Sequence, residues 1–191
     1  MEEVDNRPRC GWCNVRNPLY VDYHDNEWGV PQHDDARLFE MLILESFQAG
    51  LSWECVLNKR EAFRKAFDGF CAAKVAAYDA AKVEALCQDS GIVRNRLKIR
   101  AAIGNARVFL AMRGEFGSFD AYLWGFTGGR VVHEVGKVTS PLSDEISADL
   151  RHRGMKFVGS TMVYSLLQAV GVICSHDVGC YKSQTREGLP Q

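Results

Sequence analysis

Apolar residues recur at the three- to four-residue spacing of an α-helix through most of residues 34–171. The clearest stretch begins at Asp34 and ends at Gly50, where a glycine stops the pattern. Ser52 is placed to cap the helix that follows. Segment 128–135 is an alternating β-branched patch between glycines, and we expect a loop or a short extended piece there. Further helices are predicted at about 72–78, 80–89, 96–113, 118–125, 143–152 and 160–171. The pattern therefore predicts an all-α fold.

The first 33 residues follow no such pattern and are rich in Asn, Asp, Pro, Gly and aromatic residues. We expect them to form an ordered but irregular lobe with little helix. A lobe of this size buries too little apolar surface to be stable alone, so it needs a disulfide, a metal or another covalent or coordinative link.

The length of 191 residues suits a single domain, and seven cysteines are an odd number. The polar N-terminus lacks a secretory signal, and no apolar run approaches the roughly 20 residues of a membrane span. We expect a cytoplasmic protein without membrane contact, in which Cys55, Cys71 and Cys87 are small buried residues. The net charge of −1 excludes a uniformly basic surface but not a local basic face.

Cysteine and histidine residues gather at both ends of the chain. Cys10, Cys13 and His24 lie near the N-terminus, and His176 and Cys180 lie near the C-terminus. One cysteine and one histidine from each end would make a closed tetrahedral Cys₂His₂ zinc site, which is structural because it leaves no open coordination position. The alternative is five scattered residues that never meet, and spacing alone does not decide between these interpretations.

Glu45 is unusual because it lies in the apolar stretch "MLILESF". A carboxylate in such a stripe is rarely buried unless it has a partner or a task. The alternative is a glutamate near a helix end that reaches solvent.

Seven aromatic residues are concentrated in the first 53 positions. They form either a small aromatic core or a stacking pocket for a flat, π-rich ligand. These residues are Trp12, Tyr20, Tyr23, Trp28, Phe39, Phe47 and Trp53.

Residues 151–161, "RHRGMKFVGST", have the pattern of two helices joined by a glycine-containing turn. Glycines allow backbone N–H groups and a helix N-terminus to approach a phosphate, and Arg151, Arg153 and Lys156 supply positive charge. Tight helical hairpins also occur in proteins that never bind DNA. A second basic run at 94–100 is typical of a solvated helix face.

Several long blocks in the same order make the chain resemble the 3-methyladenine DNA glycosylase I family, within the helix–hairpin–helix glycosylase superfamily. The matching blocks cover nearly the whole chain except about 127–142 and the extreme termini. They lie at 9–12, 18–31, 38–53, 91–106, 153–171 and 176–180. The resemblance implies one glycosylase domain over 1–191, with a lobe from about 1–33 and 172–185 and a helical body over 34–171.

The resemblance also implies roles for individual residues. It implies a structural zinc ion, one per chain, bound by Cys10, His24, His176 and Cys180, which leaves Cys13 out. It implies a base pocket formed by Glu45, Tyr23 and Trp53, surrounded by Trp12 and Trp28. It implies a turn at Gly50 and Leu51 that fills the gap left by an extruded nucleotide, and a hairpin that grips the DNA backbone through Lys156, Phe157, Gly159 and Ser160.

Most members of the wider superfamily use a catalytic aspartate shortly after the hairpin, which this family lacks. Asp177 lies near the position of that aspartate in the sequence, but it is next to the implied zinc ligand His176. We therefore expect Asp177 to be a carboxylate with a local role in its loop.

The implied activity is excision of 3-methyladenine from double-stranded DNA by a monomeric enzyme, with free base and an abasic site as products. Alkylation makes the base cationic, so it leaves as a neutral molecule without protonation. Glu45, the implied catalytic-site residue, would attract the cation when ionised. We expect hydrolysis by water and no lyase activity, because no nucleophilic lysine is evident in the pocket. The alternatives are a non-catalytic, zinc-stapled DNA-binding module and a zinc hydrolase.

Overall fold

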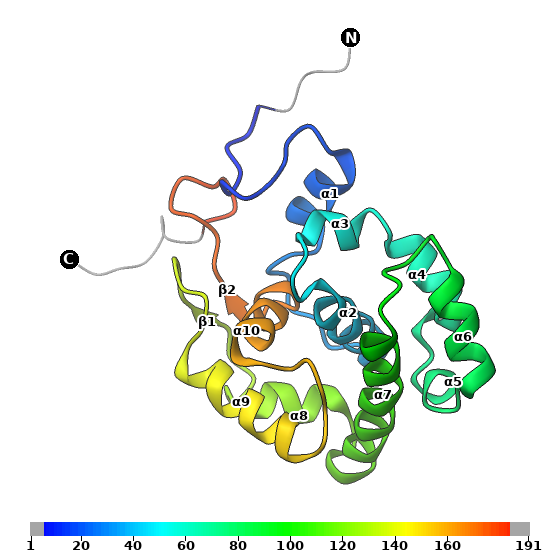
Figure 1. Cartoon of the computed structure of the whole chain (residues 1–191). Helices are drawn as coiled ribbons and strands as arrows, with labels where there is room; N and C mark the ends of the chain where they lie inside the picture. Colours follow the sequence, from blue (N-terminus) through cyan, green and yellow to red (C-terminus); the bar gives the residue numbers. More distant parts are fainter. Residues whose placement is uncertain (1–5, 184–191) are drawn as a thin grey trace.

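The computed structural model describes residues 6–183, which form a mostly helical body (Figure 1). The helices are α1 (Pro18–Asn26), α2 (Asp35–Gln48), α3 (Trp53–Leu57), α4 (Arg60–Ala66), the short 3₁₀ helix η1 (Asp68–Phe70), α5 (Ala72–Ala76), α6 (Ala80–Gln88), α7 (Arg96–Phe116), α8 (Phe119–Gly125), α9 (Pro141–His152) and α10 (Ser160–Ala169). Two short strands, β1 (Val132–His133) and β2 (Ile173–Cys174), pair in parallel. The predicted all-α fold is confirmed.

Helix α2 is the centre of the molecule, because residues 38–47 are all buried. Asp34 caps its first turn by accepting a hydrogen bond from the N–H of Arg37. Helices α3, α7, α8 and α10 pack around it, and Figure 1 shows α10 and α7 on opposite sides of α2. The Phe39 and Phe109 rings, with centroids 4.8 Å apart, join α2 to α7.

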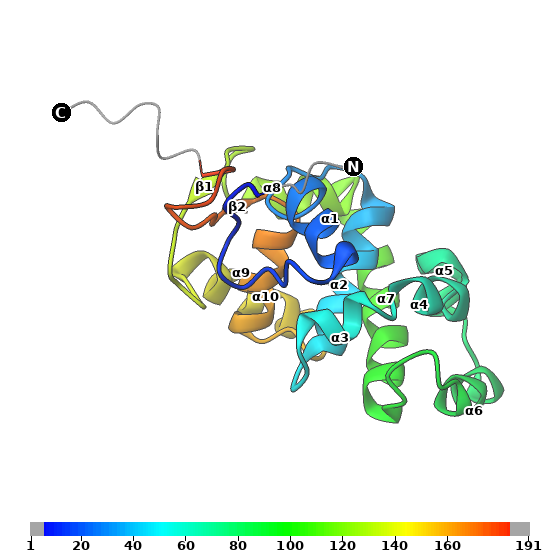
Figure 2. The same ribbon diagram turned by 90° about the horizontal axis from the view of Figure 1, so that it is seen from above.

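Helix α7 separates two parts of the molecule. Both views show α4, α5 and α6 on one side of it, away from the C-terminal segment (Figures 1 and 2). Asn95 begins α7 by accepting hydrogen bonds from the N–H groups of Leu97 and Lys98. At 21 residues, α7 is long enough to contact α2, α5, α6 and α8.

The two ends of the described chain lie side by side (Figures 1 and 2). The N–H of Tyr181 donates to the carbonyl of Pro8 at 2.8 Å, and the N–H of Gly11 donates to the carboxylate of Asp177 at 2.8 Å. These contacts bring the N-terminal residues against the C-terminal segment 175–183. Residues 1–5 and 184–185 of the expected lobe lie outside the described residues.

Three expectations about elements need correction. The N-terminal lobe contains the nine-residue helix α1, because Asn17 caps it and Pro18 suits a first helical position. Helix α4 was not predicted, and α9 begins at Pro141, two residues before the predicted start, behind a Ser140 capping box. Segment 128–135 contains the short extended piece expected there, at β1.

The expectation that Cys55, Cys71 and Cys87 are fully buried is wrong. Cys71 is exposed, and Cys55 and Cys87 are half-buried. Cys71 is the N-cap residue of α5, so it precedes the helix and does not lie on its packed face. Among the described residues, no helix combines the length and apolar character needed to cross a membrane.

Candidate functional site

A cavity of about 320 Å³ opens where α1, α2 and α3 meet α10 and the segment after β2. This volume lies at the small end of ligand sites and suits a flat heterocycle of one or two rings. Its side chains come from distant parts of the chain: Trp12, Tyr20, Tyr23, Trp28, Glu45, Gln48, Trp53, Gly136, Lys137, Ser165, Gln168, Ser175 and Asp177. The five residues that the resemblance implies for a base pocket are therefore brought together.

Glu45 projects from α2 into this cavity and is only 3% exposed, so it does not reach solvent from the helix end. Its Oε2 atom is buried and has no hydrogen-bond partner. Burial raises the pKa of Glu45 to about 8, so the side chain is mostly protonated at neutral pH in the ligand-free protein. An unpartnered buried carboxyl is costly, and it is suited to a ligand that brings a hydrogen-bond donor or a positive charge.

Tyr23 and Trp53 form the aromatic wall beside Glu45. Their ring centroids are 5.2 Å apart, and both side chains are buried. The Trp53 Nε1 atom is also buried without a partner. Burial, with a contribution from Glu45, raises the pKa of Tyr23 well above its ordinary value and keeps the phenol as a neutral donor. The cavity thus offers ring faces together with unused hydrogen-bonding groups.

Trp12 and Trp28 continue the aromatic wall toward the surface. Their rings meet edge to face with centroids 4.7 Å apart, and Trp12 is 36% exposed, so it stands at the rim. The Trp28 ring also contacts the ring of His176 at 4.7 Å between centroids. Through this contact the pocket wall rests directly on the cysteine–histidine cluster.

Sequence reasoning missed half of the lining residues. Gln48 could have been found, because it lies one turn after Glu45 on α2. Lys137, Ser165 and Ser175 had no such signal, because only the fold brings them to the cavity.

The sequence showed no nucleophilic lysine for the pocket, but the structure places one lysine, Lys137, in its lining. Its ammonium lies 3.2 Å from a carboxylate oxygen of Glu134, so the two side chains form an ion pair. Asp177 is the expected loop carboxylate, since it accepts the hydrogen bond from Gly11. It also lines the cavity, next in sequence to His176 of the cysteine–histidine cluster.

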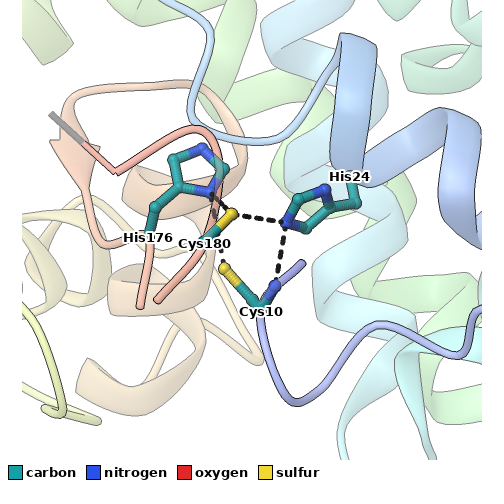
Figure 3. A group of neighbouring side chains, drawn as sticks. All are labelled: Cys10, His24, His176 and Cys180. Atoms are coloured by element: carbon teal, nitrogen blue, oxygen red, sulfur yellow. Dashed lines mark hydrogen bonds between the residues drawn. The ribbon is translucent and has the colours of Figure 1, made fainter. Parts of the chain in front are cut away.

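Cys10, His24, His176 and Cys180 converge from the two chain ends (Figure 3). All four are buried, and their donor atoms lie within 4.8 Å of one another. Cys10 Sγ is 3.4 Å from His176 Nδ1, and Cys180 Sγ is 3.4 Å from His24 Nε2. Ligand atoms around a tetrahedral zinc ion are separated by about 3.3–3.8 Å, given bonds of about 2.0–2.3 Å. The donor set and its spacing fit zinc.

The charges around this cluster also fit a cation. Burial raises the pKa of the Cys10 thiol to about 12, and a divalent cation offsets that cost by binding the thiolate. Backbone N–H groups of Asp177 and Lys182 point at the two sulfur atoms, at 3.4 Å each. Burial, with the nearby His24, lowers the pKa of His176 to about 4, so its imidazole is a neutral ligand.

Asp25 orients one of the histidine donors. Its Oδ1 atom lies 2.8 Å from His24 Nδ1, which leaves the Nε2 lone pair for a metal. Burial disfavours its charge, but hydrogen bonds from Arg9 and His24 outweigh this and lower the pKa of Asp25 to about 2. Cys13 lies outside the set, and its Sγ atom faces the carbonyl of Tyr20 at 3.7 Å.

The turn between α9 and α10 carries the hairpin residues. Phe157 adopts a positive φ of 57° and is 38% exposed. A Cβ atom added to Gly159 would meet no atom within 4 Å, so the backbone there is open to an approaching group. The Ser160 hydroxyl is engaged by Ser143 and Asp144. Ser160 is the first residue of α10, where a backbone N–H has no partner within the helix.

The turn after α2 carries Gly50 and Leu51. Gly50 has a φ of 80°, which favours glycine, and a hydrogen bond of 2.6 Å joins the N–H of Leu51 to the carbonyl of Gln48. The Leu51 side chain is 40% exposed, although it is apolar and belongs to a tight turn. The turn therefore exposes the Leu51 side chain to solvent, two residues before the pocket residue Trp53.

An all-α body with a buried carboxyl in a small aromatic cavity defines a protein that recognises a flat heterocycle. Residues 12–183 match the model of the methyladenine glycosylase family, and the chain belongs to that family.

Individual relatives agree over nearly the full length. The DNA-3-methyladenine glycosylase 1 of Escherichia coli (strain K12) is 49% identical over 179 residues, which cover 90% of this chain and 95% of the relative. A crystal structure of a 3-methyladenine DNA glycosylase I superposes with a TM-score of 0.88 at 44% identity, covering 92% of this chain and 99% of that one. The Staphylococcus aureus enzyme, solved to explain 3-methyladenine recognition, has a TM-score of 0.85 at 31% identity and covers 96% of this chain and 100% of that one.

Proposed function

We propose that this protein excises 3-methyladenine from alkylated double-stranded DNA by hydrolysis, releasing the free base and leaving an abasic site. The observation that carries the proposal is the unpartnered carboxyl oxygen of Glu45 inside an aromatic cavity of base size. Membership in the methyladenine glycosylase family supports the same activity, as does the crystal structure of a related 3-methyladenine DNA glycosylase I variant in complex with 3-methyladenine.

Recognition combines stacking with polar contacts. Trp53 stacks on the extruded base, while Glu45 and Tyr23 bind the edge that carries the exocyclic amine and N7. The alkylated base is cationic in DNA, so its entry favours the carboxylate form of Glu45 and lowers the pKa from about 8. An unmodified adenine brings no such charge and leaves Glu45 neutral. The cavity therefore discriminates by charge as well as by shape.

The substrate's own positive charge drives bond cleavage. The N9–C1′ bond breaks, its electron pair passes to the base, and the base leaves as neutral 3-methyladenine. The sugar becomes an oxocarbenium-like species, as in other glycoside cleavages. Water adds to C1′ and loses a proton to solvent. The protein's contribution is access to the base, recognition and electrostatic support from Glu45.

Lys137 does not change this proposal of a monofunctional enzyme. A lyase needs an amine that attacks C1′, and the Lys137 side chain is instead paired with Glu134 at 3.2 Å.

Two turns would engage the DNA. Backbone N–H groups at Gly159 and Ser160 would approach a phosphate, and Lys156 would add charge beside Phe157 in a helix–hairpin–helix mode. Leu51, after Gly50, would occupy the space left by the extruded nucleotide, because it is apolar and exposed.

We further propose one structural zinc ion per chain, a single monomeric domain and a cytoplasmic location. Four protein ligands leave no coordination position for water, so the ion would serve to hold the N-terminal lobe to the C-terminal segment. A zinc hydrolase is disfavoured for the same reason. A DNA-binding module without catalysis is disfavoured because it has no use for Glu45 in an aromatic cavity.

Incubation of the purified protein with methylated DNA, followed by chromatography of the released bases, tests the function. We expect 3-methyladenine to be released from DNA by the wild type and the release to fall in Glu45→Gln. Tight DNA binding without any released base would instead establish the non-catalytic module.

A further inference from the structure

Helix α7 carries a buried lysine that holds the turn after α2. Lys98 is 6% exposed, and its ammonium donates to the carbonyls of Phe47 and Ala49 at 2.8 and 2.5 Å. These carbonyls are at the C-terminal end of α2, directly before Gly50 and Leu51. The expectation that the basic run 94–100 is a solvated face is therefore wrong at Lys98.

The same helix carries a buried asparagine that holds the turn before α10. Asn105 is fully buried, its Nδ2 donates to the carbonyl of Lys156 at 2.9 Å, and its Oδ1 accepts from the N–H of Lys156 at 2.8 Å. Both backbone groups of one hairpin residue are thus occupied by one side chain. Phe157, with its positive φ, follows directly.

Lys98 and Asn105 are seven residues apart, so they lie two turns apart on one face of α7. The rise of an α-helix separates them by about 10.5 Å along the axis. Their partners lie in the two turns proposed to contact DNA. Each contact joins distant parts of the chain, because Phe47 is 51 residues before Lys98 and Lys156 is 51 residues after Asn105. One rigid helix thus sets the distance between them.

We propose that Lys98 and Asn105 are positioning residues that fix the Leu51 turn and the Lys156 turn at a set spacing, so that phosphate binding and nucleotide extrusion are coupled. This inference rests on the proposed function of the two turns. Extrusion of a stacked nucleotide costs free energy, and a preset spacing avoids the further cost of ordering two loops on the DNA.

Two features distinguish this role from ordinary helix capping. A buried ammonium is an expensive cap, and it is present although Gly50 already turns the chain at the end of α2. A strained residue such as Phe157 persists only where its surroundings hold it, and Asn105 holds the residue before it. Both devices fix the position of exposed apolar side chains, Leu51 and Phe157, rather than burying them.

The test uses Lys98→Met, which keeps the length of the side chain but removes its donors, and Asn105→Ala. Each full-length variant is measured in three ways: affinity for free 3-methyladenine, single-turnover excision from alkylated DNA, and fluorescence of 2-aminopurine beside an abasic-site analogue in a duplex. We expect free-base affinity within twofold of wild type, excision slower by tenfold or more, and a smaller fluorescence increase from unstacking.

Rescue and controls keep the interpretation specific. Lys98→Arg restores two donors and should recover much of the excision rate, whereas Asn105→Asp keeps only the acceptor and should not. Ser118→Ala removes the cap of α8, away from both turns, and should leave the 2-aminopurine signal unchanged. The double variant should lose less than the product of the single losses, because either change alone already breaks the spacing.

Wild-type excision and fluorescence in both variants would overturn the inference. A parallel fall in free-base affinity and excision would also overturn it, since the pocket itself would then be damaged. Should Asn105→Ala fail to fold, Asn105→Asp takes its place in the same measurements, and should Lys98→Met fail to fold, Lys98→Gln, which is too short to reach both carbonyls, takes its place. Failure of the wild type to release any base would reject the proposed function instead, while the fluorescence comparison would still test the spacing.

Discussion

Sγ of Cys10 lies 3.4 Å from Nδ1 of His176, although 166 residues separate them in the chain. The contact closes the fold by joining the N-terminal lobe to the segment after β2. Because the Trp28 ring packs on His176, the same contact supports the wall of the base cavity. A cluster that touches no substrate is thereby placed to influence recognition.

The cluster predicts one zinc ion per chain with a defined ligand set. Cys180→Ser should lose zinc, or hold it loosely, and the N-terminal lobe should become sensitive to proteases. Cys13→Ser should keep the metal, since its sulfur faces the Tyr20 carbonyl instead. Metal analysis of both variants is sufficient, and zinc lost from Cys13→Ser but kept in Cys180→Ser would contradict the assignment.

Glu45→Gln should bind free 3-methyladenine more weakly and excise it more slowly, while the fold survives. The amide keeps the shape of the side chain but cannot become a carboxylate beside the cationic base in DNA, which slows excision. For the neutral free base, the amide replaces one carboxyl oxygen with an NH₂ group and so changes the hydrogen bonds that the side chain can make. We expect a partial loss, on the order of tenfold to a thousandfold, because the substrate's charge weakens its own bond. Binding titration and single-turnover kinetics measure the two effects. Wild-type values in both would show that Glu45 has no role in base recognition or excision.

The same substitution should stabilise the protein at alkaline pH. The folded state keeps a proton on Glu45 that the unfolded state releases between pH 4.5 and about 8, so stability falls as pH rises through that window. At about 1.36 kcal/mol per pKa unit, the cost reaches several kcal/mol above pH 8. Denaturant unfolding should give equal stability for both proteins near pH 4.5 and a more stable Glu45→Gln at pH 8.5. A constant difference across pH would exclude the buried titration.

Gly159→Val should weaken binding to all duplex sequences alike. The free protein has room for the side chain, so the expected loss reflects the distance kept from a phosphate. Affinity should fall about tenfold, and the slope of log K against log salt should shrink by about 0.9 for one lost phosphate contact. Gly159→Ala should show a smaller loss. Unchanged affinity and an unchanged salt slope in the valine variant would show that this turn does not bind a DNA phosphate.

Borohydride trapping should yield no covalent complex with alkylated DNA, because the amine of Lys137 is paired with Glu134. Lys137→Ala should likewise release base without a change in products. A trapped complex that is present in the wild type and absent from Lys137→Ala would show a lyase step through this residue.

Local chemistry determined most of the helices. Periodic apolar residues and caps such as Asp34 and Ser52 act within a few residues, so they are visible in the chain itself. The same signals were present at Asn17 and Pro18, where the aromatic and polar composition obscured helix α1. Cys10, His24, His176 and Cys180 could be named because metal ligands belong to few residue types, but their spacing did not separate Cys10 from Cys13.

Only the tertiary structure decided which side chains are buried and which distant residues come into contact. Lys98 lies in a run of basic residues, and nothing local distinguishes it from an exposed neighbour until the end of α2 packs over it. Lys137 and Ser175 reach the cavity through the pairing of β1 with β2, a contact between segments about 40 residues apart. Burial and proximity depend on the whole chain, and they set the pKa of Glu45 and the cost of its unpartnered oxygen. Residue types determined which chemistry is available, and the packing of distant segments decided where it is used.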